Sequence, residues 1–183
     1  MKRLVLAGAL AVAAILGGAA WVVEEEPGWY QRTRYPLRYG AIVQAHARNY
    51  DLQPALLAAV IYTESKFDAG ARSSAGAVGL MQLLPGTAKG IAERTGGDRF
   101  VVSDLLDPEL NVRYGSWYLR NLLDRYEDLE TALAAYHAGQ GNVDRWRREG
   151  AGIQFPETRT YVRRVLDAEQ VYADVYAEEL PAG

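Results

Sequence analysis

Apolar positions recur at helical spacing through most of this chain. No stretch shows the alternation of apolar and polar residues that is typical of strands. Proline, glycine and Asp-Pro pairs mark the breaks between the helical stretches. The pattern predicts helices over residues 37–50, 54–65, 87–94, 107–126, 129–138, 142–148 and 157–178. We therefore expect an all-α fold with two longer loops, 69–78 and 98–106.

The helix predicted over residues 54–65 carries an acid on its apolar face. Leu57, Val60, Ile61 and Glu64 fall at i, i+3, i+4 and i+7, so they share one side of the helix. Burial among apolar side chains disfavours a charged carboxylate and raises its pKa, and the nearby helix C-terminus acts in the same direction. Glu64 is therefore a candidate general acid, although a solvated residue at a helix end would fit the same spacing.

The first residues have a different composition from the rest. Lys2 and Arg3 precede an uncharged apolar run over residues 4–23. A basic start before an apolar run is typical of an export signal. Cleavage near residues 18–20 would make it a signal peptide, whereas its length of about 20 residues favours a retained membrane anchor. Both alternatives place the remaining chain outside the cytoplasm.

Breaks in the pattern divide the chain into three parts. Residues 1–23 form the signal or anchor, and residues 24–36 form a short tether with Pro-Gly and Tyr-Pro breaks. Residues 37–178 form the folded domain, which is long enough to bury a core. We expect a compact helical domain behind an N-terminal hydrophobic segment.

Composition excludes several classes of site. The 183 residues contain no Cys, so disulfides and thiolate metal sites are absent. The two histidines, His46 and His137, lie far apart in the sequence, which disfavours a His-rich metal centre. The net charge of −3 is not the basic balance of a nucleic-acid-binding protein. We expect no metal, no cofactor and no nucleic-acid partner.

Four sequence blocks occur in an order known from one enzyme family. They are Glu64-Ser65; Gly79-Leu80-Met81-Gln82 with Pro85-Gly86-Thr87-Ala88 behind it; Ala134-Ala135-Tyr136-His137-Ala138-Gly139; and Glu157-Thr158-Arg159 followed by Tyr161-Val162. Together they resemble the catalytic domain of Slt-type lytic transglycosylases, which are lysozyme-like enzymes that cleave the glycan strands of peptidoglycan. The resemblance covers most of the chain and implies a lysozyme-like fold.

The resemblance also accounts for the lack of a second catalytic acid. Ordinary glycosidases use two carboxylates, but Asp68, the acid nearest to Glu64, fits a solvated turn residue better. In the family a single Glu acts as acid and then as base, and the C6 hydroxyl of N-acetylmuramic acid closes onto C1. This intramolecular attack leaves a 1,6-anhydro sugar without using water. The resemblance implies that Glu64 has this role.

The first two blocks and the loop between them supply candidate substrate contacts. The resemblance implies that Ser73 contacts a sugar and that Leu84, where relatives often carry Met, forms an apolar cleft wall. Gln82 offers a donor and an acceptor for hydroxyl and acetamido groups. Gly79 would let the backbone approach a ligand closely. Ser65 would cap the helix end or orient Glu64.

The later blocks supply aromatic and polar candidates. Tyr114 and Tyr136 are possible sugar platforms, although each would also fit as a core aromatic. The resemblance implies that Ala135 and Tyr136 meet the substrate and that Tyr136 lies close to the catalytic acid. His137 stands where the family usually has Asn, and we interpret it as a tolerated variant that could alter pH dependence.

The last block opens the final helix. Glu157 would complement the helix dipole there, and the resemblance adds a possible substrate contact. Tyr161, one turn on, would be core or cleft rim.

The leading hypothesis is a peptidoglycan lytic transglycosylase. The alternatives are a hydrolytic muramidase or chitinase on the same fold, a non-catalytic wall-binding module, and an anchored helical scaffold. Peptidoglycan is the expected partner, together with the membrane if residues 4–23 are retained.

Overall fold

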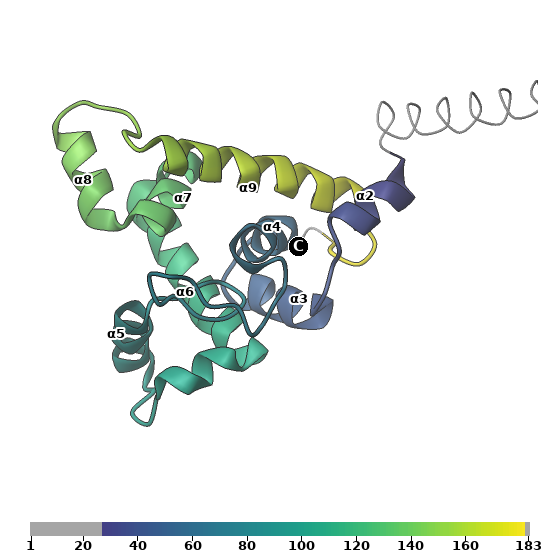
Figure 1. Ribbon diagram of the computed structural model, residues 1–183, viewed down its shortest axis with the longest axis horizontal. Coiled ribbons are helices and arrows are strands. Elements are labelled where there is room, and N and C mark those ends of the chain that lie inside the picture. The colour runs from purple at the N-terminus through teal and green to yellow at the C-terminus, as the bar shows by residue number, and fades with distance from the viewer. Residues whose placement is uncertain (1–26, 182–183) are drawn as a thin grey trace, which may run out of the picture. The chain divides into compact units, whose positions relative to one another are not determined.

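The computed structural model describes residues 27–181 and is helical throughout its regular elements (Figure 1). These elements are α2 (Gly28–Arg34), α3 (Gly40–Asn49), α4 (Pro54–Ser65), α5 (Pro85–Thr95), the 3₁₀ helix η1 (Val102–Leu106), α6 (Pro108–Tyr126), α7 (Leu129–Ala138), α8 (Gln140–Arg148) and α9 (Pro156–Val175). Within residues 27–181 the only β-pairing is two isolated bridges in the loop after α4. The predicted all-α class is confirmed.

The chain divides into two units between Pro36 and Leu37. In the first unit, the segment expected to be a tether contains the short helix α2. The predicted signal or anchor, residues 1–23, lies outside the described residues. Within 27–181, no helix is both long and apolar enough to cross a bilayer.

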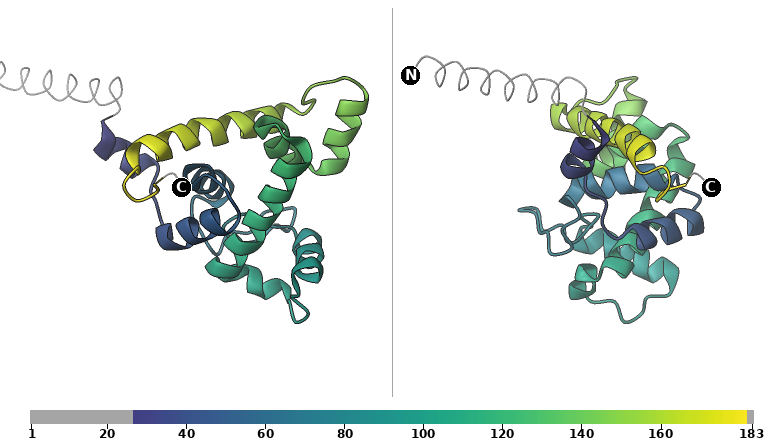
Figure 2. Two further views of the ribbon diagram at one scale, coloured as in Figure 1. Left: turned by 180° about the vertical axis from the view of Figure 1, so that it is seen from behind. Right: turned by 90° about the vertical axis from the view of Figure 1, so that its right-hand side faces the viewer.

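Helix α4 is the centre of the second unit. The predicted apolar stripe was too narrow, because every residue from Pro54 to Ile61 is buried. α4 packs most extensively against α9, from which Tyr161, Val165 and Tyr172 are buried. Of the two alternatives for Tyr161, core or cleft rim, its burial agrees with the core. α7 and α8 gather at the start of α9 (Figure 2), so the end of α7 is held near the last turns of α4.

Several helix limits follow from local capping chemistry. The Asp107 carboxylate accepts a hydrogen bond from the Leu110 N–H at 2.8 Å and caps α6, as the sequence predicts. Asp128 caps α7 in the same way, through the Thr131 N–H at 2.8 Å. The predicted loop 98–106 was wrong in part, because η1 occupies its second half.

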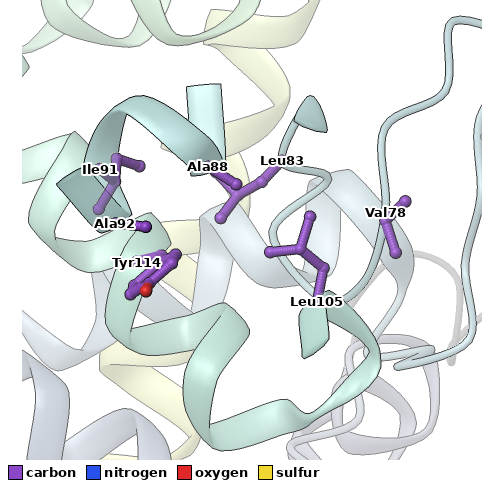
Figure 3. Close-up of a cluster of buried hydrophobic side chains, with 7 residues drawn as sticks. All are labelled: Val78, Leu83, Ala88, Ile91, Ala92, Leu105 and Tyr114. Atoms are coloured by element: carbon purple, nitrogen blue, oxygen red, sulfur yellow. The ribbon is translucent and has the colours of Figure 1, made fainter. Parts of the chain in front are cut away.

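A second hydrophobic cluster secures the loop that follows α4. It joins that loop to α5, η1 and α6 and consists of Val78, Leu83, Ala88, Ile91, Ala92, Leu105 and Tyr114 (Figure 3). Because Val78 and Leu83 flank Gly79-Leu80-Met81-Gln82, their burial in this cluster fixes the position of the second sequence block.

Candidate active site

A cleft of about 360 Å³ lies at the C-terminal end of α4. Its walls come from the loop after α4, the start of α5, α6 and the end of α7. The lining residues are Glu64, Ser73, Ala75, Ala77, Gln82, Leu83, Leu84, Thr87, Tyr118, Tyr136, His137, Ala138 and Gly139. The fold therefore brings together residues of the first three sequence blocks, and Glu64 is the one carboxylate among these lining residues.

Glu64 lies in the last turn of α4 and is partly buried. The helix ends directly after it, since Lys66 takes a left-handed conformation with φ of 54°. Burial raises the pKa of the Glu64 carboxyl from 4.5 to about 7, and the smaller effect of the Tyr161 hydroxyl lowers it. A carboxyl with this pKa can both donate and accept a proton near neutral pH.

Two tyrosines supply hydroxyl groups close to Glu64. Burial, and then the negative charge of Glu64, raises the pKa of both Tyr136 and Tyr161 well above the usual value, so both remain protonated. The Tyr136 hydroxyl donates to the Met81 carbonyl at 2.8 Å, and its ring packs against Tyr118 with 5.4 Å between centroids. The buried Tyr161 hydroxyl has no hydrogen-bond partner within normal distance among the described residues. Its proton can therefore be directed toward the Glu64 carboxylate, whose pKa this hydroxyl lowers.

Asn111, which the sequence interpretation missed, fixes the shape of the Gly79–Gln82 loop. Its side chain is fully buried in α6. Its Oδ1 accepts from the Met81 N–H at 2.8 Å, and its Nδ2 donates to the Val78 and Leu105 carbonyls, each at 2.9 Å. Asn111 therefore supplies the polar partners that this buried loop backbone requires. A polar residue beside the apolar Val112 in the predicted helix was the signal that could have identified it.

The reason for glycine at position 79 differs from the predicted one. Gly79 has φ of 83°, and a Cβ there would lie 2.2 Å from the Asn111 Nδ2 and 2.3 Å from the Leu105 carbonyl oxygen. Close packing against α6 and η1, rather than approach of a ligand, therefore accounts for this glycine.

Gln82 and Ser73 line the cleft, but part of their hydrogen-bonding capacity is used internally. The Gln82 Nε2 donates to the Ala71 and Gly79 carbonyls at 3.2 and 2.9 Å, which leaves its Oε1 as an acceptor for a ligand. The Ser73 Oγ accepts from the Ala77 N–H at 3.0 Å and can still donate. Leu84 is 46% exposed and forms apolar wall.

His137 joins the cleft wall to the start of α9. Its Nδ1 lies 3.0 Å from the Thr158 Oγ1, and its ring packs against Tyr161 with 4.5 Å between centroids. Desolvation lowers the pKa of His137, while the smaller effect of Glu157 raises it. His137 therefore supports Tyr161, and through it the position of Glu64, mainly as a neutral ring.

The structure places other candidates outside the cleft lining. Tyr114 belongs to the second hydrophobic cluster and Ala135 is fully buried, and neither lines the cleft that contains Glu64. The Ser65 Oγ donates to the Ile61 carbonyl at 3.1 Å, four residues earlier within α4. Glu157 is exposed in the first turn of α9 and does not line the cleft.

Some lining residues were not anticipated. Thr87, Tyr118, Ala138 and Gly139 also line the cleft. Tyr118 lies on a helix whose apolar pattern is explained by the core, so the sequence gives no separate signal for it. Within residues 27–181, no group of three or more acidic or histidine side chains could hold a metal ion.

Comparison with solved structures defines the fold class. The 70 kDa soluble lytic transglycosylase of Escherichia coli superposes with a TM-score of 0.75 and 28% identity, over 94% of this chain and 30% of that chain. An inactive Glu-to-Gln mutant of lytic transglycosylase Slt from Pseudomonas aeruginosa gives a TM-score of 0.72 and 34% identity, over 78% of this chain and 25% of that chain. The domain therefore has the lysozyme-like transglycosylase fold that the sequence predicts.

Sequence comparison gives the family. The Transglycosylase SLT domain family matches residues 41–154, and the chain belongs to this family. It is 33% identical over 180 residues to the soluble lytic murein transglycosylase of Salmonella typhimurium, covering 89% of this chain and 26% of that protein. It is also 41% identical to a transglycosylase of Enterobacteria phage PRD1, covering 59% of this chain and 37% of the phage protein. This chain therefore spans only about a quarter to a third of these relatives' length.

The raised pKa of Glu64 predicts a pH-dependent stability. From about pH 4.5 to about 7 the native state keeps a proton that the unfolded state has released, so stability falls as pH rises and stays lower above pH 7. Glu64→Gln removes this dependence. Urea unfolding at pH 5 and pH 8 should show the variant gaining about 1–3 kcal/mol relative to wild type at the higher pH. A difference that does not change with pH would contradict the raised pKa.

Proposed function

We propose that this domain is a peptidoglycan lytic transglycosylase in which Glu64 acts first as acid and then as base. The observation that carries the proposal is Glu64 itself. It is a partly buried carboxyl with a pKa of about 7 that lines a cleft, and no second carboxylate is among the cleft-lining residues. The relatives named as lytic transglycosylases support this reaction. The inactive Glu-to-Gln mutant of the Pseudomonas protein supports a glutamate as the essential group.

The cleft has the groups that each step needs. Protonated Glu64 donates its proton to the glycosidic oxygen between N-acetylmuramic acid and N-acetylglucosamine, and the bond to C1 breaks. The Glu64 carboxylate then accepts the proton of the C6 hydroxyl, whose oxygen bonds to C1 and closes the 1,6-anhydro ring. The carboxyl is protonated again at the end, so the cycle consumes no water. The Tyr161 hydroxyl stabilises the carboxylate that exists between the two steps.

The products distinguish this reaction from hydrolysis. Mass spectrometry of muropeptides released from purified peptidoglycan should show fragments that end in 1,6-anhydro-N-acetylmuramic acid. Hydrolysis would instead give reducing ends that are heavier by one water. Reducing ends as the main product would replace the proposal with the muramidase alternative, and binding without any product would replace it with a wall-binding module.

We also propose that the domain acts outside the cytoplasm, where peptidoglycan lies. The support is the apolar run of residues 4–23 behind Lys2 and Arg3. Relatives include membrane-bound lytic murein transglycosylase F of Vibrio cholerae, which matches 63% of this chain. We expect a reporter enzyme fused after residue 183 to be active only on the extracytoplasmic side and to lose that location when residues 4–23 are deleted. Unchanged location after the deletion would overturn the proposal.

A further inference from the structure

Thr158 is a fully buried polar side chain that the proposed reaction steps leave without a role. It lies in the first turn of α9, and its Oγ1 is 3.0 Å from the His137 Nδ1. Among the residues that the structure describes, His137 is the one hydrogen-bond partner of this hydroxyl. A buried hydroxyl that does not donate its proton costs free energy. The Thr158 hydroxyl is therefore the donor in this bond, and the His137 Nδ1 is the acceptor.

The direction of this bond fixes the tautomer of His137. A neutral imidazole carries its proton on one ring nitrogen and accepts a hydrogen bond at the other. Desolvation lowers the pKa of His137, so the ring is neutral at neutral pH. Since the Nδ1 accepts from Thr158, the proton of the neutral ring lies on the Nε2. The buried threonine thereby makes His137 an N–H donor at its Nε2.

The part of the ring that carries the Nε2 is the part left open to the cleft. Tyr161 packs against the His137 ring with 4.5 Å between centroids, and Thr158 covers the Nδ1. His137 is nevertheless exposed, and it lines the same cleft as Glu64. Its exposed surface therefore belongs to the remaining part of the ring, which includes the Nε2.

A free side-chain N–H is scarce in this cleft. Among the lining residues, only Gln82 and His137 have side-chain N–H groups. The Gln82 Nε2 donates within the protein, to the Ala71 and Gly79 carbonyls. His137 therefore supplies the one side-chain N–H among the lining residues that is available to a ligand.

We propose that the His137 Nε2–H donates to an acetamido carbonyl oxygen of the glycan, with Thr158 as the positioning residue that keeps the proton on the Nε2. This inference rests on the proposed function, which places N-acetylmuramic acid and N-acetylglucosamine in the cleft, and both sugars carry an acetamido group. An amide carbonyl is a stronger acceptor than a sugar hydroxyl or ring oxygen. Asparagine, which the family usually has at this position, ends short of the Nε2, so its amide could pair with Thr158 without reaching the same point of the cleft.

Nitrogen-15 NMR of the full chain tests the tautomer without any substrate. The chain contains two histidines, so the His137 signals are those that His137→Asn removes. In a buffer basic enough to keep the ring neutral, the wild type should show a protonated Nε2 and an unprotonated Nδ1. A proton found mainly on the Nδ1 would overturn the proposal.

Two threonine variants test the positioning role in the same spectra. Thr158→Val keeps the size of the side chain but removes the hydroxyl, so part of the His137 population should move its proton to the Nδ1. Thr160→Val is the matched control, because the exposed Thr160 Oγ1 donates to the Pro156 carbonyl within α9, and it should leave the tautomer unchanged. An unchanged tautomer in Thr158→Val would overturn the positioning role of Thr158.

Calorimetric titration with the tetramer of N-acetylglucosamine tests the contact itself. His137→Asn keeps a partner for Thr158 but loses the donor at the place of the Nε2, so it should weaken binding about three- to tenfold, as expected for one lost hydrogen bond. His137→Gln reaches that place with its amide and should bind more tightly than His137→Asn. A purely structural role predicts the opposite order, because glutamine does not fit the bond to Thr158. Weaker binding by His137→Gln than by His137→Asn would overturn the proposal.

The β-1,4-linked glucose tetramer, which has a hydroxyl in place of each acetamido group, identifies the acceptor. The tetramer of N-acetylglucosamine should shift the Nε2 signal of His137, and the glucose tetramer at the same concentration should not. Equal shifts would overturn the acetamido contact. None of these measurements depends on cleavage. A wild type that shows the expected tautomer and binding but releases no muropeptides would remove the proposed function alone, whereas one that cleaves without them would overturn the His137 contact alone.

Discussion

Glu64→Gln should reduce the release of 1,6-anhydro products about 10³–10⁴-fold, which is the upper range for the loss of a general acid–base group. Glutamine keeps the size and hydrogen-bonding shape of the side chain but can neither donate a proton to the glycosidic oxygen nor accept one from the C6 hydroxyl. Because one residue performs both steps, no other cleft-lining carboxylate can take over either of them. The rate of anhydro-muropeptide formation, followed by mass spectrometry, measures this effect.

Asp68→Asn is the matched control for this substitution. Asp68 is the nearest acid in the sequence, but its carboxylate is exposed and accepts a hydrogen bond from the Gly70 N–H at 2.9 Å, as a turn residue does. We expect the rate of this variant to stay within about twofold of wild type, because Asp68 does not line the cleft. A loss comparable with that of Glu64→Gln would show that the reaction uses two carboxylates.

Gly79→Ala should destabilise the domain by about 3 kcal/mol or more. The new methyl group would overlap both the Asn111 side chain and the Leu105 carbonyl, and neither can move without breaking hydrogen bonds in the buried loop. The left-handed backbone at φ of 83° adds a further cost for any residue with a Cβ. Urea unfolding of the variant beside wild type gives the difference in free energy.

Gly76→Ala separates these two costs. Gly76 has nearly the same backbone conformation, with φ of 84°, but a Cβ there would meet no atom within 4 Å. We expect this variant to lose only about 1–2 kcal/mol, the cost of the left-handed conformation itself. Equal destabilisation by the two substitutions would mean that the Gly79 loop absorbs the overlap and that Asn111 does not constrain it.

The sequence predicted best what local chemistry determines. The helices 54–65 and 129–138 have the predicted limits, because proline or an aspartate cap begins them and left-handed Lys66 or Gly139 follows them. The position of Glu64 at the end of a buried helix could also be predicted, since it depends only on helical spacing and on the apolar residues around it. The short helix α2 within the predicted tether was missed, since one helical turn or two leaves a weak periodic signal.

Contacts between distant segments could not be predicted in the same way. The reason for glycine at position 79 lies 26 and 32 residues further along the chain, at Leu105 and Asn111. Residue type and helical spacing did not separate Tyr114 from Tyr136 as candidate platforms, although the family resemblance favoured Tyr136. Packing separates them, because Tyr114 lies in a hydrophobic cluster whereas Tyr136 lines the cleft. No spacing rule within one helix contains that information.

The hydrogen bond from the Tyr136 hydroxyl to the Met81 carbonyl has a consequence for how the cleft works. It links the end of α7 to the Gly79–Gln82 loop, which Asn111 in turn holds to α6, so these parts of the cleft wall are tied together before any substrate arrives. A site built this way is preorganised, and little of the glycan's binding free energy is consumed in reshaping it. The free and glycan-bound domains should therefore superpose closely around Glu64, with the width of the cleft unchanged.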